Sequence, residues 1–249
     1  MKKNACCLVF LLILTSDILA QNIAKDSIIF RNFGSRDFQA ATANYSIVED
    51  ENGIMYAANE NGILEYDGSE WNLISIKNFS GALTIKLSPD GKLYVGGVNE
   101  FGYLERGASG QLTYHSLRDL INPELEIKEV WQVIFHNNEI YFQSYESIIR
   151  YDGELAHILD IIISWLVPLN DQLLISTYNK GLGQLNGDEA HYMEEVLSFE
   201  GDAPFKLLPG PDGNMLALTE YNGAYLLDTT DFSFEKWDIE ANTSLTKYG

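Results

Sequence analysis

A short motif that ends in a tight turn recurs about every forty residues along this chain. The clearest copies run Gly62–Gly68, Ser147–Gly153 and Gly181–Gly187, and looser copies run Gly102–Gly107 and Gly223–Asp228. Each copy lies in a unit rich in short strands and turns, and a repeat of this length and composition is the signature of a β-propeller. We therefore expect an all-β fold built from four-stranded antiparallel blades.

The repeat divides most of the chain into blades. We expect the first strands of the blades to open at Tyr45, Leu83, Trp131, Ser164 and Phe205. The blades then cover about 44–77, 82–118, 130–160, 163–197 and 204–239, with the start of a sixth at 244–249, so that 44–249 is the propeller. Because the sequence ends as a sixth blade begins, we expect an incomplete propeller at the front of a longer protein; closure with five blades is the alternative.

The first hairpin turn of each unit carries the local signal for a reversal. Three of these turns contain Asn-Gly or Asp-Gly, in which glycine takes a positive φ without a Cβ clash. The other two, at Asn137-Asn138 and Asn170-Asp171, lack glycine, and we expect them to be longer or of another type. Short helical turns are expected at Ser116–Leu125 and Met193–Ser198.

The first twenty residues predict a secretory signal peptide. Lys2 and Lys3 precede an apolar run from Ala5 to Leu14, and we place cleavage after Ala20. The chain is therefore expected in the periplasm or outside the cell, with no membrane span after cleavage. Both cysteines of the chain lie within this leader, at positions 6 and 7. The mature chain would then contain no disulfide and no thiolate metal site.

Residues 21–43 form an N-terminal segment before the first blade. Within it, Ser27–Arg31 is apolar enough to supply a closing outer strand for the last blade.

Charge excludes two classes of partner. The chain has 16 basic and 36 acidic residues, which gives a net charge of −20. Nucleic-acid binding and docking on anionic lipid both need clustered lysine and arginine, so neither partner is expected.

The first blade resembles a known family. The segments Asn44–Tyr56 and Asn61–Gly68, followed by Trp71, are similar to the two-component regulator propeller repeat, and more narrowly to the periplasmic sensor half of triple-tyrosine (Y_Y_Y) domain regulators. The resemblance covers 30–237 and is weakest in the second blade, where Arg106-Gly107 replaces Tyr-Asp-Gly. It implies a sensor of extracellular ligands, with oligosaccharides as the best-known class. It also implies partner signalling domains downstream in a longer chain or on another protein.

No catalytic residue, metal site or cofactor is expected. His115, His136, His157 and His191 lie on successive units and should diverge around a ring, whereas a metal needs converging ligands. Asp67 and Asp152 recur through the repeat, which indicates turn formers rather than a catalytic carboxylate pair. A Gly-x-Ser-x-Gly nucleophile motif is absent from the sequence.

Aromatic residues at the blade openings are the candidates for binding. Tyr45, Trp131 and Phe205 would present rings near the central channel, and flat rings suit the faces of sugars. The alternative is that these rings pack between blades. The function that we expect is therefore a ligand-sensing propeller, possible targets being small molecules or oligosaccharides; the alternatives are a protein-interaction scaffold and a propeller glycosidase or lyase.

Overall fold

A computed structural model describes residues 31–163, 165–177, 180–192, 204–219 and 221–237, apart from the side chains of Asn78 and Phe205. The chain divides into two compact units, residues 1–34 and 35–249. In the described part of the first unit, the Arg31 guanidinium lies 4.6 Å from the centre of the Phe33 ring. The expected leader, the closing strand up to residue 30, the helical turn at 193–198 and the start of a sixth blade lie outside the described residues.

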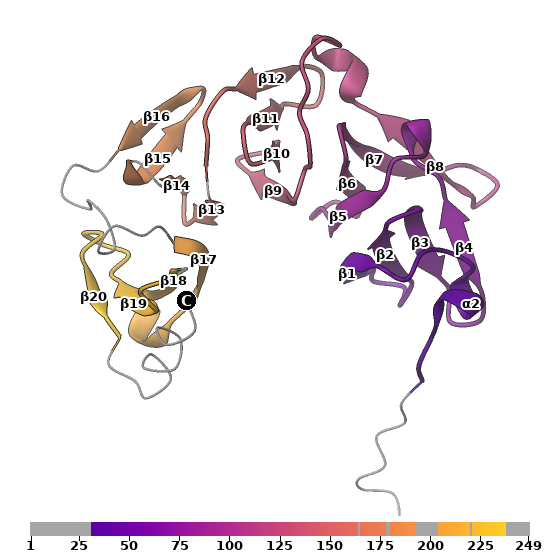
Figure 1. Ribbon diagram of the computed structural model, residues 1–249, viewed down its shortest axis with the longest axis horizontal. Coiled ribbons are helices and arrows are strands. Elements are labelled where there is room, and N and C mark those ends of the chain that lie inside the picture. Colours follow the sequence, from indigo (N-terminus) through magenta and orange to yellow (C-terminus); the bar gives the residue numbers. More distant parts are fainter. Residues whose placement is uncertain (1–30, 164, 178–179, 193–203, 220, 238–249) are drawn as a thin grey trace, which may run out of the picture. The chain divides into compact units, whose positions relative to one another are not determined.

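The second unit is all-β, as the sequence predicted, and contains five separate four-stranded antiparallel sheets (Figure 1). The first sheet contains β1 (Asn44–Glu49), β2 (Met55–Asn59), β3 (Gly62–Tyr66) and β4 (Trp71–Ile74). The second contains β5 (Ala82–Leu87), β6 (Leu93–Gly97), β7 (Glu100–Arg106) and β8 (Leu112–Ser116). The third contains β9 (Gln132–His136), β10 (Glu139–Gln143), β11 (Ile148–Tyr151) and β12 (Ala156–Leu159). The fourth contains β13 (Trp165–Leu169), β14 (Gln172–Thr177), β15 (Gly181–Asn186) and β16 (Glu189–Tyr192). The fifth contains β17 (Pro204–Pro209), β18 (Met215–Thr219), β19 (Ala224–Leu227) and β20 (Phe234–Lys236).

Helical structure in the described residues is limited to single turns. The α-helix α2 (Ser35–Phe38) precedes the first sheet, and the 3₁₀ turns are η1 (Lys77–Phe79), η2 (Arg118–Leu120) and η3 (Pro211–Gly213). The helical turn expected at 116–125 is therefore the short 3₁₀ turn η2. Within the part of the chain that the structure describes, no helix is long and apolar enough to cross a membrane.

The five sheets are successive blades of a propeller. Within each sheet, strands that are consecutive in sequence are neighbours, so every connection is a hairpin. The first strand of each sheet contacts the first strand of the next, from β1 through β5, β9 and β13 to β17. This arrangement of four-stranded sheets joined at their first strands is the propeller architecture that the repeat predicted.

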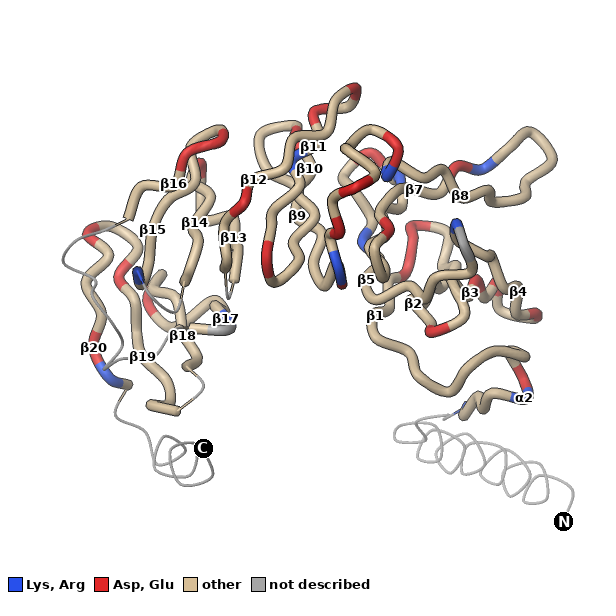
Figure 2. The backbone as a smooth tube through the Cα atoms, turned by 45° about the horizontal axis from the view of Figure 1, so that its top comes forward, with Lys and Arg blue, Asp and Glu red and all other residues tan. Residues whose placement is uncertain are grey.

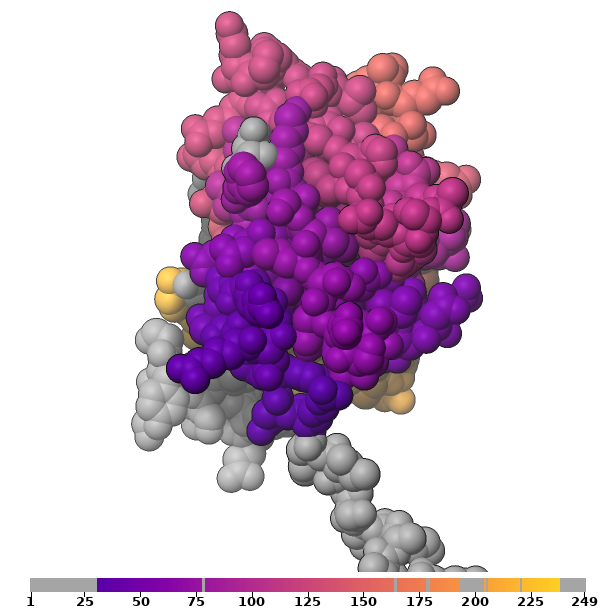
Figure 3. All heavy atoms as spheres, turned by 90° about the vertical axis from the view of Figure 1, so that its right-hand side faces the viewer, coloured from indigo at the N-terminus to yellow at the C-terminus, as the bar shows by residue number. Residues whose placement is uncertain are grey.

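Apolar side chains from consecutive sheets form the cores. Each of four buried clusters draws its residues from two or more neighbouring sheets. In one of them, Phe101 of β7 and Phe142 of β10 are fully buried, and their ring centres lie 4.9 Å apart. Figure 3 shows side chains of the first sheets packed against one another as spheres. Since a single sheet cannot cover its own apolar faces, each blade depends on its neighbours for burial.

Ion pairs also join consecutive sheets. Arg106 at the end of β7 donates to Glu65 of β3 at 2.7 Å, and Arg150 of β11 lies 2.8 Å from Asp188, which follows β15. Glu65 and Arg150 occupy the same position in the third strand of their sheets, one residue before the final tyrosine. This position of the third strand therefore forms an ion pair with the next sheet in both cases, but it is acidic in the first sheet and basic in the third. Other acidic residues lie largely in turns, as the red segments of Figure 2 show.

The turns without glycine are of another type than the glycine turns, which is one of the two expected alternatives, and they are shorter rather than longer. His136 pairs directly with Glu139, and Leu169 pairs with Gln172, so each of these turns has only two residues. Asn137 and Asn138 both have positive φ values, of 49° and 63°. Asparagine adopts the left-handed conformation more readily than most side chains, so it can replace glycine in the shortest type of hairpin.

Replacing Phe142 with alanine tests the dependence of the fold on packing between sheets. Because Phe142 is fully buried against Phe101 of the preceding sheet, we expect the free energy of unfolding to fall by about 3–5 kcal/mol in a urea titration. The control is Leu155→Ala, whose side chain is 57% exposed and should change stability by less than about 0.5 kcal/mol. Equal effects of the two substitutions would contradict this account of the core.

Candidate functional site

The exposed apolar side chains gather at one end of the sheets. Neighbouring strands of a sheet run in opposite directions. The chain therefore enters the first strand at the same end of the sheet as the hairpin between the second and third strands, and we call this end the entry end. The opposite end, which carries the first hairpin turns, is called the turn end. The large apolar residues exposed at the entry end include Tyr45, Phe79, Val98, Leu120, Leu125, Trp131, Tyr145, Ile162 and Tyr221. Such a concentration marks a surface available for binding.

Three of these side chains form an aromatic cluster, defined as Tyr45, Trp131 and Tyr145. The ring centres of Tyr45 and Trp131 lie 6.3 Å apart, with an angle of 83° between the ring planes. Those of Trp131 and Tyr145 lie 6.0 Å apart, at 56°. The exposed fractions are 48% for Tyr45, 40% for Trp131 and 59% for Tyr145, so the rings contact one another and still face solvent. The cluster joins the first sheet to the third.

A bulge in the first sheet directs Tyr45 toward this cluster. Asn44 pairs with Asn59 and Ser46 pairs with Ala58, so Tyr45 is an extra residue in β1 with no partner in β2. A bulge of this kind turns a side chain out of the regular alternation of the strand. The same register shift occurs at the start of β5 and of β17, which places Phe205 at the position equivalent to Tyr45.

Trp131 is held by hydrogen bonds to two sheets. Its backbone N–H donates to the carbonyl of Gln143 in the third sheet at 2.9 Å. The preceding residue, Val130, donates to the carbonyl of Gly97 in the second sheet at 3.0 Å. Val130 approaches closely because residue 96 is glycine; a Cβ there would lie 2.5 Å from the Val130 Cγ1. Trp131 is thus fixed before β9 begins.

Tyr145 lies at the tip of the hairpin between β10 and β11. The Ser144 hydroxyl accepts hydrogen bonds from the backbone N–H groups of Glu146 and Ser147, at 3.3 and 3.0 Å, which holds this tip in a tight turn. The Glu146 carboxylate pairs with the Lys128 ammonium at 2.5 Å and links the hairpin to the segment before Trp131. Both partners are exposed, so this pair contributes little stability, and its effect is chiefly to orient the loop.

The structure thus brings together two of the three predicted binding residues. Tyr45 and Trp131 are in contact, whereas the side chain of Phe205 lies outside the described residues, so its role stays a prediction. Trp165 of β13 is buried in the core. Sequence reasoning missed Tyr145. Its position in a hairpin at the entry end was the signal that could have identified it.

The aromatic cluster offers apolar ring faces set nearly at right angles. A ligand in such a corner can place its apolar C–H groups against two ring faces, while its polar rim stays in water. Among the residues that the structure describes, no group of three or more His, Cys, Asp or Glu side chains is placed to hold a metal ion. The exposed rings make the cluster a candidate for ligand binding.

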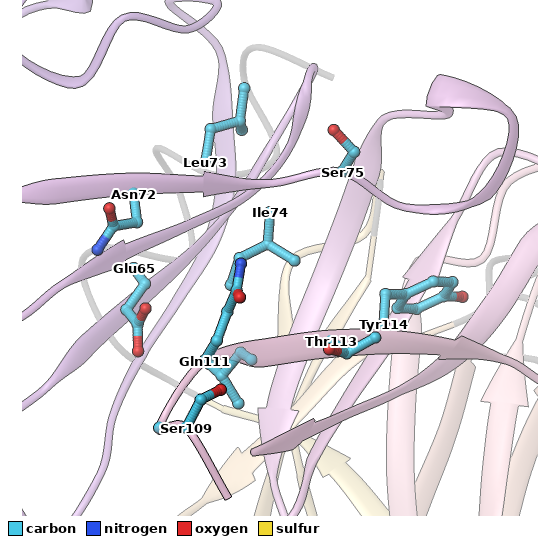
Figure 4. Close-up of a pocket in the computed structure, with 11 residues that line it drawn as sticks. Glu65, Asn72, Leu73, Ile74, Ser75, Ser109, Gln111, Thr113 and Tyr114 are labelled. Atoms are coloured by element: carbon cyan, nitrogen blue, oxygen red, sulfur yellow. The ribbon is translucent and has the colours of Figure 1, made fainter. Parts of the chain in front are cut away.

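A groove of about 730 Å³ between β4 and β8 is a second candidate. Figure 4 shows the Glu65 carboxylate and the amides of Asn72 and Gln111 beside it. The only aromatic ring among its lining residues is Tyr114, which is half-buried and whose hydroxyl donates to Glu100 at 3.0 Å. Without an exposed ring, the groove is the weaker candidate.

The recurring aspartates have the turn-forming role that the repeat indicated. Asp67 accepts hydrogen bonds from the backbone N–H groups of Glu70 and Ser69, both at 2.8 Å, and these bonds lower the pKa of its carboxyl. Asp152 accepts in the same way from Leu155 and Glu154, with the same effect on its pKa. The hydrogen-bonding capacity of both carboxylates is directed to their own turns.

Comparisons with solved structures agree with the fold. The chain is similar to the extracellular domain of a B. thetaiotaomicron protein described as a hybrid two component system, with 16% identity and a TM-score of 0.57, over 88% of this chain and 30% of that one. It is also similar to virginiamycin B lyase from Staphylococcus aureus, with 14% identity and a TM-score of 0.58, over 79% and 71% of the two chains. A third similar structure is the WD40 β-propeller domain of Doa1, with 11% identity and a TM-score of 0.56, over 77% and 67%. No family model and no curated protein matches the sequence. At these identities the likeness establishes the propeller fold, and its neighbours include an extracellular domain and an enzyme.

Fluorescence quenching tests the exposure of the cluster. The chain has four tryptophans, of which Trp131 is 40% exposed and Trp165 is 4% exposed. We expect Trp131→Phe to lower the Stern–Volmer constant for acrylamide, because it removes an accessible fluorophore. Trp165→Phe should raise it, because it removes a shielded one. The opposite order would show that Trp131 is covered.

Proposed function

We propose that this chain is an exported binding module that captures a small ligand on the aromatic cluster. The observation that carries the proposal is the contact between Tyr45 and Trp131, which belong to different sheets and remain exposed. Packing between blades, the alternative role for these rings, would bury them. Export is supported by the leader sequence and by the extracellular origin of one similar structure.

An oligosaccharide fragment is the ligand class that fits the cluster best. A sugar ring has an apolar face of C–H groups and a rim of hydroxyls, which matches an open corner of aromatic rings. The net charge of −20 disfavours polyanionic ligands such as nucleic acid. The resemblance of the first blade to the two-component regulator propeller repeat supports the same ligand class.

The way the cluster is assembled supports a sensor role. Tyr45 belongs to the first sheet, whereas Trp131 is bonded to the third sheet and the preceding Val130 to the second, so a ligand that contacts both rings depends on the spacing between sheets. A ligand that prefers one spacing shifts the protein toward it, and a downstream signalling domain or partner protein would respond to that shift. In this proposal the chain contains no catalytic centre.

A protein-interaction scaffold is the second candidate, and one observation favours it. Phe79 is 88% exposed and has a φ of 53°, a conformation that is costly for a bulky side chain. Val98, exposed at the same end, is adjacent, because the Ser80 hydroxyl donates to its carbonyl at 2.8 Å. A partner protein could cover Phe79 and Val98, which lie outside the aromatic cluster.

Ligand titration of the Trp131→Ala variant tests the proposed function. We expect neutral oligosaccharides in a panel to raise the melting temperature of the wild-type chain, since a ligand that binds only the folded state stabilises it. Removal of the indole should weaken binding about tenfold or more, consistent with the loss of one stacked ring. Leu155→Ala at the turn end is the control and should bind as the wild type does.

Two outcomes separate the alternatives. If the panel leaves the melting temperature unchanged while Phe79→Ser abolishes capture of a partner protein, the scaffold is the better account. If Trp131→Ala and the control bind the oligosaccharide equally well, the cluster is not the site.

A further inference from the structure

A pocket of about 660 Å³ lies at the turn end, between the first hairpin turns of the second and third sheets. Its lining includes Ser88, Asp90, Tyr94, Phe135, Glu139 and Ile140. Tyr94 and Ile140 are buried beneath it, and exposed turn residues form its rim. The pocket is separate from the aromatic cluster, which lies at the entry end.

A repeated tyrosine shows what is unusual about this pocket. Tyr56, Tyr94 and Tyr141 occupy the same register position in the second strands of the first three sheets. In the first sheet, the Tyr56 hydroxyl donates to the Asp50 carboxylate at 3.2 Å. In the third sheet, the Tyr141 hydroxyl donates to the Glu139 carboxylate at 2.7 Å. In both sheets, a carboxylate from the first hairpin accepts a hydrogen bond from the tyrosine hydroxyl.

The second sheet lacks this carboxylate because serine replaces aspartate. The backbone N–H of Asp50 donates to the carbonyl four residues later, and that of Ser88 makes the same bond to Lys92, so the two residues are equivalent. The short Ser88 side chain instead bonds the Lys92 carbonyl at 2.8 Å and the Asp90 carboxylate. The polar side chains of this turn therefore bond within the turn, and none of them bonds the Tyr94 hydroxyl.

The Tyr94 hydroxyl has no hydrogen-bond partner among the described residues, although the residue is only 7% exposed. Its ring is held between Phe135 and Phe142, at centre-to-centre distances of 5.6 and 6.2 Å. The Tyr94 hydroxyl is not one of the fully shielded side-chain atoms of the described residues, and Tyr94 lines the pocket, so the hydroxyl is open to a hydrogen bond from a group that enters there.

The charges at the pocket determine which kind of ligand group it can bind. Its lining contains the carboxylates of Asp90 and Glu139 and no lysine or arginine. Glu139 is already paired with Arg150 at 2.5 Å. The Ser88 hydroxyl bonds the Asp90 carboxylate and thereby lowers its pKa, so Asp90 is negative at neutral pH.

The hydroxyl itself stays protonated at neutral pH. Burial, followed by the charge of Asp90, raises the pKa of Tyr94 to about 12. The hydroxyl therefore presents free lone pairs beside a carboxylate and an aromatic floor. Lys86, whose ammonium lies 5.7 Å from the centre of the Phe135 ring, is not part of the lining.

We propose that this pocket binds a small organic ammonium ion that carries an apolar group. The ammonium donates to the Tyr94 hydroxyl and pairs with the Asp90 carboxylate, and the apolar group lies against Phe135 and Ile140. Each partner matches a property of the pocket: a hydroxyl oxygen without a partner among the described residues, an ionised carboxylate and apolar side chains that can cover a ligand.

Titration of the full chain with phenethylamine, followed by NMR and calorimetry, tests the proposal. We expect saturable binding of phenethylamine and none of phenylacetate, which has a similar shape and the opposite charge. Tyr94→Phe and Asp90→Asn should each weaken binding about fivefold or more, as expected for the loss of one hydrogen bond or one charge. Ser88→Asp, which supplies the carboxylate that the other sheets have, should weaken binding by occupying the hydroxyl.

Tyr56→Phe is the matched control, because it removes a hydroxyl at the same repeat position that is already satisfied. It should lower the melting temperature and leave amine affinity unchanged, whereas Tyr94→Phe should leave the melting temperature unchanged or raise it. Trp131→Ala should not affect amine binding, so failure of the oligosaccharide proposal would be distinguishable. The proposal is overturned by equal binding of phenylacetate, by no amine binding up to ~10 mM, or by an ordered water that satisfies Tyr94 in the presence of amine.

Discussion

Burial of apolar surface between consecutive sheets is the interaction on which this structure depends. Each sheet has two apolar faces, and the clusters that cover them combine residues from neighbouring sheets, as Phe101 and Phe142 do. The hydrogen-bonded ladders lie within single sheets, so side-chain packing supplies most of the cohesion between them. Ion pairs such as Arg106 with Glu65 add orientation at the same junctions. The spacing between sheets is therefore set by packed side chains, and a site that spans sheets inherits that spacing.

Both proposed sites arise where one copy of the repeat departs from the others. At the entry end, the bulged residues near the start of the first strands are Tyr45 and Leu83 in the first two sheets, and the tyrosine is exposed whereas the leucine is buried. At the turn end, Asp50 satisfies the tyrosine of its sheet, and its equivalent Ser88 does not. In both proposals, the residues that bind are ones at which a repeat differs from its neighbours, on a framework that the repeats share. This division is expected of a scaffold in which each unit has the same structural task.

The fold could be predicted almost completely from the sequence, because the period and the hairpin turns repeat five times and reinforce one another. The turn at Asn137-Asn138 could be expected to differ in type from the glycine turns, but its shortness could not, since it depends on two asparagines in the left-handed conformation. Tyr45 and Trp131 could be named as channel residues, but their contact could not, because it depends on the spacing of sheets and on a bulge. Tyr145 was missed although its position in the hairpin between β10 and β11 could have identified it. By contrast, an alignment of Asp50 with Ser88 in the repeats would predict from the sequence that Tyr94 lacks a carboxylate partner in its own turn.

Ligand binding at the aromatic cluster can be observed through its tryptophan. The most direct measurement is ¹⁹F NMR of the chain labelled with 5-fluorotryptophan, which reports on all four tryptophans at once. On addition of an oligosaccharide mixture, the account predicts that the Trp131 resonance shifts and saturates while that of the buried Trp165 stays in place. Movement of other tryptophan resonances with Trp131 unchanged, or no movement of any, would contradict it.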